Sequence, residues 1–308
     1  MSQARDNLTG IGLMIAAATS FAAFSALVKV VHPRIPVFEI IFFRGAITWA
    51  LLGLWRRSRP AAIPAGASRR DLLTRALLGF AGLVMYVWAV THVELGIASA
   101  LNQSSPVFVG LFAFLLLGEK PHRLVPPLVL LGFAGAVLIV SPDLGGINIH
   151  AAVGFASALA SALAYTWVRK LAATEHPVTI VQWFSGLVMV LGFPLMLLEG
   201  WVTPTPFEAL MIFLQGLLSL AGQLFLTWAY TKGEAAVVSP FIFAAVLETL
   251  VAGWLFWDEW PPQGAIVGAS LLVLSSLGIV VLARRDRPVV SEPPVPADPY
   301  PPASGRGP

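Results

Sequence analysis

The sequence contains no cysteine and little charge. Only 11% of its 308 residues are Asp, Glu, Lys or Arg, whereas soluble domains carry about a quarter. The lack of cysteine excludes disulfide frameworks and thiolate metal sites, and the five histidines show no paired spacing of the HExxH type. We therefore expect neither a cofactor nor a catalytic metal.

Apolar residues take the place of the missing charge. Hydrophobic residues make up 57% of the chain and the mean hydropathy is +0.81, which predicts an integral membrane protein. The net charge of +3 does not indicate nucleic acid, because most Arg and Lys residues lie between apolar segments, as topology signals do. The expected partners are the lipid bilayer and a small molecule, with no nucleic acid.

The apolar residues fall into segments of membrane-spanning length, since a spanning helix needs about 20 residues. Pro, Gly and charged clusters separate the segments. They cover residues 9–31, 37–55, 72–91, 95–117, 124–140, 151–170, 178–198, 208–230, 235–257 and 263–282. The sequence therefore predicts an all-α membrane protein with ten transmembrane helices.

The chain repeats itself at an offset of 140 residues. The identical pairs are Ala81/Ala221, Gly82/Gly222, Trp88/Trp228, Ala89/Ala229, Thr91/Thr231 and Glu94/Glu234. At an offset of 141 the repeat extends upstream and pairs Phe24 with Tyr165 and Arg44 with Ser185. We predict a polar cytoplasmic lead (1–8), two five-helix repeats (9–140 and 151–282) and a proline-rich, disordered cytoplasmic tail (283–308).

Five helices are an odd number, so the second copy must enter the membrane from the opposite side. The positive-inside rule then places both termini in the cytoplasm. The cytoplasmic loops would hold Arg5, Arg56, Arg57, Arg59, Arg69, Arg70, Arg75, Lys120, Arg123, Arg169, Lys170, Lys232, Arg284, Arg285, Arg287 and Arg306. The outside loops would keep only Lys29 and Arg34 as basic residues.

The inverted pair of five helices, the G-E-K-P (118–121) and D-E-W-P (258–261) turns, and the A-G-x5-W-A-x-T-x-x-E run together resemble the EamA family of the drug/metabolite transporter superfamily. The resemblance implies a central cavity formed by the first four helices of each repeat, with the fifth and tenth helices at the periphery. It implies a carrier in the cell inner membrane. Some members export amino acids and other metabolites, and others import vitamins or S-adenosylmethionine.

Two ionisable residues lie well inside apolar runs, where a charge is costly and faces a cavity or a partner. Arg44 presents a planar fork suited to a carboxylate or phosphate of the substrate; alternatively, it forms a buried ion pair with Glu39 or Glu248. Burial favours the neutral form of a carboxyl group, so Glu248 is a candidate for proton coupling; alternatively, it pairs with Arg44 or with a cationic substrate group.

Polar residues next to prolines interrupt corresponding helices of the two repeats, which points to a binding site at the membrane midplane. Asn102 and Gln103 precede Pro106, and Ser239 precedes Pro240; the alternative is a simple kink. Further polar and aromatic candidates for the cavity are Tyr86, Tyr165, Trp167, Gln182 and Gln223. Trp88 and Trp228 fit interfacial anchors better.

Small residues also mark the fifth and tenth helices, at Gly132, Gly135, Gly264 and Gly268. They predict close helix contact, either within the chain or in a weak homodimer.

We conclude that the chain is a carrier rather than an enzyme. It is expected to export amino acids, including aromatic ones, or related metabolites by alternating access, with protons or a counter-substrate as coupling partner. The alternatives are an importer of a vitamin, nucleoside or S-adenosylmethionine-like compound, and, less favoured, a channel or a membrane-embedded enzyme.

Overall fold

The computed structural model describes residues 2–58, 68–117, 124–140, 148–171, 174–232 and 239–285, and these residues form helices without any strand. The first repeat comprises α1 (Ser2–Val31), α2 (Val37–Ser58), α3 (Arg69–His92), α4 (Leu95–Asn102), α5 (Ser105–Leu117) and α6 (Val125–Val140). The second comprises α7 (Ile149–Leu171), α8 (Pro177–Glu199), α9 (Pro206–Lys232), the 3-10 helix η2 (Ser239–Phe243), α11 (Ala244–Trp257) and α12 (Gln263–Arg285). The proline-rich tail from residue 286 onward lies outside the described residues.

Six of the described helices are long and apolar enough to cross a membrane. They contain Leu8–Val31, Val37–Arg57, Arg69–His92, Ile149–Val168, Pro177–Glu199 and Pro206–Ala229. Shorter apolar helices occur at Leu130–Ile139, Phe241–Trp257 and Gln263–Ser275. The multi-helical membrane fold is therefore confirmed, while the count of ten spans stays a prediction.

The segment 95–117, which we counted as one helix interrupted beside Pro106, forms two helices, α4 and α5, with a break at Gln103 and Ser104. Proline has no backbone N–H, and Pro106 lies in the first turn of α5, where none is needed. Ser104 Oγ donates to the Leu101 carbonyl at 2.6 Å. In the second repeat, Pro240 lies in η2, which precedes α11. Both repeats thus depart from a regular α-helix at corresponding positions, by a break in the first and by a 3-10 turn in the second.

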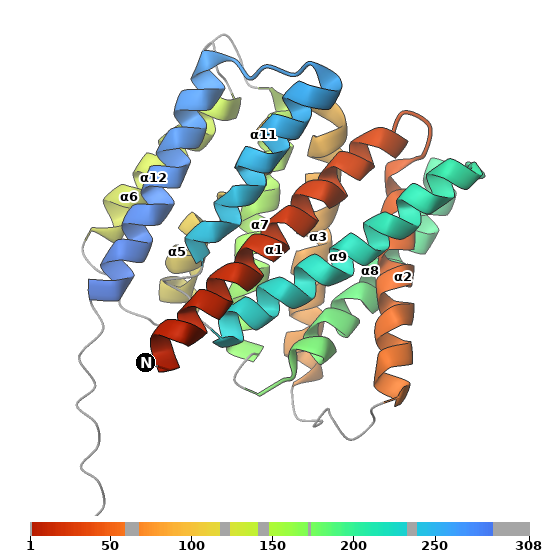
Figure 1. The fold of residues 1–308 in the computed structure, drawn as a ribbon, viewed down its shortest axis with the longest axis horizontal. Coiled ribbons are helices and arrows are strands. Elements are labelled where there is room, and N and C mark those ends of the chain that lie inside the picture. Colours follow the sequence, from red (N-terminus) through yellow and green to blue (C-terminus); the bar gives the residue numbers. More distant parts are fainter. Residues whose placement is uncertain are drawn as a thin grey trace, which may run out of the picture.

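The two repeats face each other in a pattern expected for copies related by a two-fold axis. α1 packs on α9, and the corresponding helix of the second repeat, α7, packs on α3. α2 packs on its repeat mate α8, and α6 packs on its repeat mate α12. α1 begins at the end of the molecule where α12 ends, and α7 starts at the opposite end (Figure 1). We call these the terminal end, where α1 begins and α12 ends, and the far end, where α1 meets α2.

Glycines shared by the repeats lie where helices cross. A Cβ on Gly82 would lie 3.2 Å from the Ser161 backbone nitrogen on α7, and one on Gly222 would lie 2.6 Å from the Phe21 ring on α1. Because neither site has room for a side chain, the shared glycines bring α3 close to α7 and α9 close to α1.

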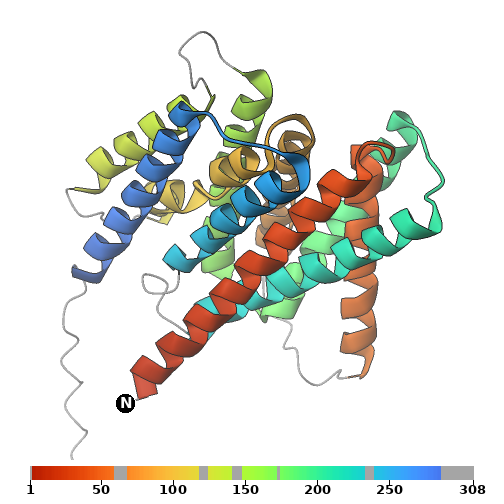
Figure 2. The same ribbon diagram turned by 45° about the horizontal axis from the view of Figure 1, so that its top comes forward.

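The α6 and α12 pair forms one edge of the molecule and lies to the side of the crossing α1 and α9 helices (Figures 1 and 2). Gly135 and Gly268 approach each other's carbonyl oxygens, since a Cβ on either would lie 2.6 or 2.5 Å from that oxygen. Ser275 Oγ also donates to the Leu128 carbonyl at 2.6 Å. These small residues therefore pack the two helices together within the chain.

Candidate functional site

A buried cavity lies between the two repeats, and α1, α2, α3, α4, α7, α8, α9 and α11 all contribute to its lining. The lining residues are Phe21, Phe24, Arg44, Arg75, Gly79, Gly82, Leu83, Tyr86, Ser99, Asn102, Gln103, Ser161, Ala164, Tyr165, Phe184, Gln223 and Ala245. Its volume is about 70 Å³, well below the roughly 300 Å³ of a small ligand pocket. The cavity in this conformation is therefore smaller than a typical metabolite-binding pocket.

Arg44 on α2 reaches this cavity with 6% of its surface exposed. Its Nε donates to Ser219 Oγ at 2.5 Å, and its Nη1 is buried without a hydrogen-bond partner. The guanidinium carbon lies 5.0 Å from the centre of the Phe24 ring. Aromatic faces and one hydroxyl hold this cation, which leaves part of its fork free for an anion.

The carboxylates considered as partners for Arg44 bind elsewhere in the described structure. Glu39 Oε2 accepts from the Val202 backbone nitrogen at 3.1 Å, and Glu248 Oε1 accepts from Thr19 Oγ1 at 2.8 Å. Arg44 forms no ion pair with either of them in the part of the chain that is described. A structural ion pair therefore does not account for its burial.

Arg75 is a cavity residue that the sequence interpretation missed. We assigned it to a cytoplasmic loop as a topology signal, which is wrong because α3 begins at Arg69 and Arg75 is 3% exposed. Its guanidinium carbon lies 4.3 Å from the centre of the Phe184 ring, and its Nε and Nη1 have no hydrogen-bond partner. A Cβ on Gly79 would lie 2.5 Å from Arg75 Nη1, so the absence of a side chain there lets the arginine extend inward.

Arg44 and Arg75 lie close to the same aromatic ring. Their guanidinium carbons are 5.7 and 4.3 Å from the centre of the Phe184 ring, and these distances allow at most 10 Å between them. At that separation two cations repel by roughly 1.7 kcal/mol at an effective dielectric constant of about 20. No Asp or Glu belongs to the described lining, so the cavity is strongly electropositive.

Two tyrosines add hydroxyl groups to the lining. The Tyr86 hydroxyl and Ser25 Oγ are 2.6 Å apart and share a hydrogen bond between α3 and α1. Tyr165 on α7 also lines the cavity, and it occupies the repeat position of Phe24, which lines it from α1. Both copies of the repeat thus present an aromatic ring at this position, but only the second copy presents a hydroxyl.

Amide side chains line the cavity beside the helix break. Asn102 Nδ2 donates to Ser157 Oγ at 3.0 Å, and Gln103 follows α4 directly. Gln223 lines the cavity from α9 in the second repeat, and its repeat mate Leu83 lines the cavity from α3 in the first. These amides supply both donors and acceptors for a polar substrate.

Three of the predicted site residues lie elsewhere, and the side chain of a fourth, Ser239, is not described. Trp167 Nε1 donates to Asp71 Oδ1 at 3.2 Å near the terminal end, and Gln182 Oε1 accepts from Arg56 Nη1 at 3.0 Å between α2 and α8. Glu248 lies between α1 and α11 and does not belong to the cavity lining. Ser239 lies in η2, and its side chain is outside the described part.

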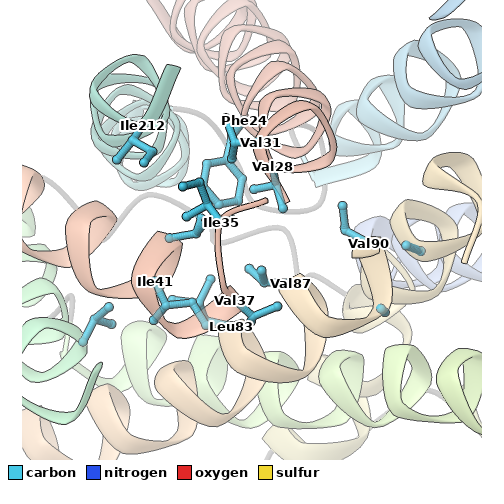
Figure 3. Close-up of a cluster of buried hydrophobic side chains, with 14 of the residues drawn as sticks. Phe24, Val28, Val31, Ile35, Val37, Ile41, Leu83, Val87, Val90 and Ile212 are labelled. Carbon is cyan, nitrogen blue, oxygen red and sulfur yellow. The ribbon is translucent and has the colours of Figure 1, made fainter. Parts of the chain in front are cut away.

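A cluster of apolar side chains, which we call the plug, extends from the cavity lining to the connection between α1 and α2 at the far end. Figure 3 shows its labelled members. Phe24 and Leu83 belong to both the cavity lining and this plug. The other labelled members are Val28, Val31, Ile35, Val37, Ile41, Val87, Val90 and Ile212. They come from α1, α2, α3, α9 and the connection between α1 and α2, so side chains of both repeats contribute to the plug.

Carboxylates from the second repeat hold the same end together. Glu199 accepts from the backbone nitrogens of Val37 and Phe38 at 3.3 and 2.7 Å, which satisfies free N–H groups at the start of α2. Glu259 forms an ion pair with Lys29, and its Oε2 accepts from the Leu95 nitrogen at 2.8 Å.

Glu94 lies beside this ion pair in the connection between α3 and α4. Burial raises the pKa of the Glu94 carboxyl, and the nearby Lys29 ammonium partly offsets that shift. The far end is therefore held together by apolar packing and by charged contacts between the repeats.

Comparison with known proteins identifies the type of molecule. The profile of the EamA-like transporter family matches residues 8–141 and again residues 148–281. The pseudopaline exporter CntI of Pseudomonas aeruginosa is 35% identical over 275 residues, which are 88% of this chain and 95% of that protein. A riboflavin transporter of Rhizobium johnstonii is 34% identical over 208 residues, 68% of this chain and 69% of its own.

More distant similarities agree. An S-adenosylmethionine uptake transporter of Rickettsia conorii is 22% identical over 290 residues, 90% of this chain and 94% of that protein. A solved crystal structure superposes with a TM-score of 0.61 at 20% identity over 92% of this chain and all of the other, which supports the fold. The two family matches cover nearly all of the described helices. The chain belongs to the EamA-like transporter family.

Proposed function

We propose that this protein is a secondary active carrier of the cell inner membrane that exports amino acids, including aromatic ones, or related small acidic metabolites. The observation that carries the proposal is Arg44, a buried guanidinium that faces the cavity with a free Nη1 and no carboxylate partner in the described structure. A planar fork of N–H donors matches a carboxylate in geometry and charge. The carboxylate of the substrate would then pair with Arg44, which has no carboxylate partner among the described residues.

The remaining lining fits the rest of an amino-acid-like substrate. Tyr86, Tyr165 and the carbonyl oxygens of Asn102 and Gln103 are acceptors for an amino group, and the Phe24 ring offers a face to an aromatic side chain. The cavity carries no reacting constellation of His, Asp or Ser among its described residues. Binding and release, rather than catalysis, suit this lining.

The similarity to CntI, an exporter that is 35% identical over 95% of its length, supports export as the direction. Import of a vitamin or nucleoside is the second candidate, since riboflavin transporters are among the relatives and another relative is an uptake transporter. A cationic substrate of the S-adenosylmethionine kind is disfavoured here, since Arg44 and Arg75 make the cavity electropositive.

Alternating access is the proposed mechanism. Ten spans with both termini in the cytoplasm would give the two repeats opposite orientations, and rocking them about the cavity would open one end as the other closes. The apolar plug at the far end would then be the extracellular gate. Protons or a counter-substrate would drive the cycle, with Glu248 between α1 and α11 as the coupling candidate.

Counterflow into proteoliposomes tests the proposal. Vesicles preloaded with unlabelled amino acids, nucleosides, vitamins or sugar phosphates are given a labelled trace of the same compound. A carrier accumulates the trace transiently and with saturation, whereas a channel gives uptake that does not saturate. Saturable counterflow of amino acids supports the proposal, and flux that rises linearly with concentration sinks it.

Arg44→Ala is the matching variant, and Arg56→Ala on the same helix is its control, because Arg56 lies outside the cavity and pairs with Gln182. We expect Arg44→Ala to reduce counterflow to the level of protein-free vesicles while the protein elutes as a folded species. Arg56→Ala should transport normally. An Arg44→Ala protein that aggregates in detergent would instead assign Arg44 a structural role.

A further inference from the structure

We infer that the substrate carries two negative charges, one facing Arg44 and the other facing Arg75. The inference rests on the proposed carrier function and narrows its substrates to compounds with two negative charges, which excludes the aromatic amino acids. Its first support is charge balance. Two buried guanidiniums line one cavity that has no Asp or Glu among its described residues. A zwitterion or a single carboxylate would leave at least one of them uncompensated.

The hydrogen-bonding state of the two arginines is the second support. Arg44 has a buried Nη1 without a partner, and Arg75 has both Nε and Nη1 without one. Buried donors are normally satisfied, so these three N–H-bearing atoms mark the positions of missing acceptors. They belong to two side chains on different helices, α2 and α3, which points to acceptor groups at both.

Distance limits the size of the substrate. Both guanidinium carbons lie within 5.7 Å of the centre of the Phe184 ring. Two carboxylates joined by a spacer of a few carbons can therefore reach both arginines while the spacer packs on Phe184. A phosphate monoester, which carries two charges on one group, is the other source of the same chemistry. The experiments below separate these two sources.

The repeat supplies an internal comparison. The second-repeat residues that correspond to Arg44 and Arg75 are Ser185 and Gln215, which are neutral. The fold therefore accepts a neutral residue at both positions, and shared packing does not explain either charge. Both positive charges come from the first copy alone, as expected if they are kept for a ligand.

Matched pairs of compounds test the charge requirement in proteoliposomes. The carboxylate arm compares succinate with succinamate, and the phosphate arm compares glycerol 3-phosphate with glycerol. A mixture of small bacterial metabolites, followed by mass spectrometry, covers diacids outside these pairs. We expect accumulation of doubly charged compounds over their singly charged or neutral partners by about 30-fold or more. Equal accumulation within the pairs, and accumulation from the mixture of compounds with fewer than two negative charges, would overturn the inference.

The result remains distinct from a failure of the carrier function. If the protein accumulates no compound above protein-free vesicles, the carrier proposal fails and the inference fails with it. If it accumulates zwitterionic amino acids with one carboxylate by saturable counterflow, the carrier proposal stands and only the two-charge inference is lost.

Variants that remove one charge test whether the arginines cause the preference for doubly charged compounds. Arg75→Gln introduces the residue that the second repeat has at this position, and Arg56→Gln is the control outside the cavity. We expect Arg75→Gln to abolish the preference for a diacid over its monoamide, whereas Arg56→Gln keeps it. Arg75→Lys keeps the charge but loses the fork, so it should retain part of the preference. An unchanged preference in Arg75→Gln contradicts the inference.

Thermal unfolding of the substrate-free protein reports whether Arg75 stabilises or destabilises the fold, which transport assays do not report. If Arg75 is an uncompensated cation kept for the ligand, Arg75→Gln should raise the midpoint of unfolding of the substrate-free protein. The diacid should stabilise the wild type and lose this effect in the variant. A lower midpoint in Arg75→Gln would show that Arg75 holds the fold together, and would overturn its role as an anion site.

Discussion

Single residues decide the chemistry of this cavity, and Arg75 shows how sequence position can mislead. It follows the basic pair Arg69 and Arg70, so the charge pattern favoured a loop. In the structure, its side chain passes Gly79 one turn later and meets Phe184 on another helix. The signal available in the sequence was an arginine followed at i+4 by glycine inside an apolar run. Only the position of Phe184, which is distant in sequence, gives that signal its meaning.

Arg44 could be predicted as a site residue because it lies deep in an apolar run, where a charge is costly unless it faces a cavity or a partner. Whether its partner was a protein carboxylate could not be decided from sequence, since helix pairing places Glu39 and Glu248. In the structure, Glu39 accepts a hydrogen bond from the Val202 backbone nitrogen, and Glu248 accepts one from the Thr19 hydroxyl. Arg44 is left with Ser219 and a free Nη1.

Glu248 is the residue for which we predict a pH response. Its Oε2 is buried without a partner, and it lies between α1 and α11, which would separate during transport. Glu248→Gln keeps the acceptor for Thr19 but cannot exchange a proton. We expect exchange of substrate to remain intact while accumulation driven by a pH gradient falls to the level without a gradient.

Glu208→Gln is the control for this measurement, because Glu208 lies at the far end beside Arg34 and outside the cavity lining. It should respond to the pH gradient as the wild type does. A Glu248→Gln protein with a normal pH response would remove Glu248 from the coupling mechanism.

At the scale of helices, the residues shared by the two repeats explain packing. Gly82 and Gly222 are repeat mates, and each lies where a helix of one repeat crosses a helix of the other. The predicted breaks next to Pro106 and Pro240 appear as the α4–α5 break and as η2. Local chemistry suffices for such features, because proline and glycine act on the backbone itself.

Gly82→Val tests the helix crossing. The added side chain would meet Ser161 and the Ser157 carbonyl, which lie 2.8 to 3.3 Å from a Cβ, so α3 and α7 must separate. We expect a loss of about 1–3 kcal/mol of stability, measured as a lower midpoint of thermal unfolding in detergent. Gly12→Val on α1, where nothing lies within 4 Å of a Cβ, is the control. Equal effects of the two substitutions would refute close packing as the role of Gly82.

At the scale of the whole molecule, the two repeats have the same packing but different charges. Helix pairs map onto each other when the repeats are exchanged, yet both cavity arginines belong to the first repeat. Symmetry of packing suits a carrier whose two open states use similar interfaces. Asymmetry of charge suits a substrate that has no such symmetry.

Cysteine labelling tests orientation and alternation together, since the protein has no cysteine of its own. Val28 is fully buried in the apolar plug, so Val28→Cys should react with an external, membrane-impermeant maleimide only while substrate is transported. Thr203→Cys at the far end should react at all times, and Ser68→Cys at the terminal end only after permeabilisation. Reaction of Ser68→Cys in intact cells would reverse the proposed topology. A Val28→Cys that stays unreactive during transport would exclude opening through the plug.

The sequence by itself determined the membrane class, the duplication, the broken helices and the family, because composition, repeated residues and proline act locally or are visible in one dimension. It also identified Arg44, Tyr86, Asn102, Gln103, Tyr165 and Gln223, six residues that line the cavity. It placed Trp167, Gln182 and Glu248 there too, although the structure puts them in other contacts.

Only the tertiary structure decided which of these side chains share one space. A helix turns by 100° per residue, so polarity and depth along the chain do not say which neighbour a side chain meets. The crossing of α2, α3 and α8 brings Arg44, Arg75 and Phe184 together. That contact joins residues from three separate helices, and it places Arg75 at the cavity beside Arg44 and not in a loop.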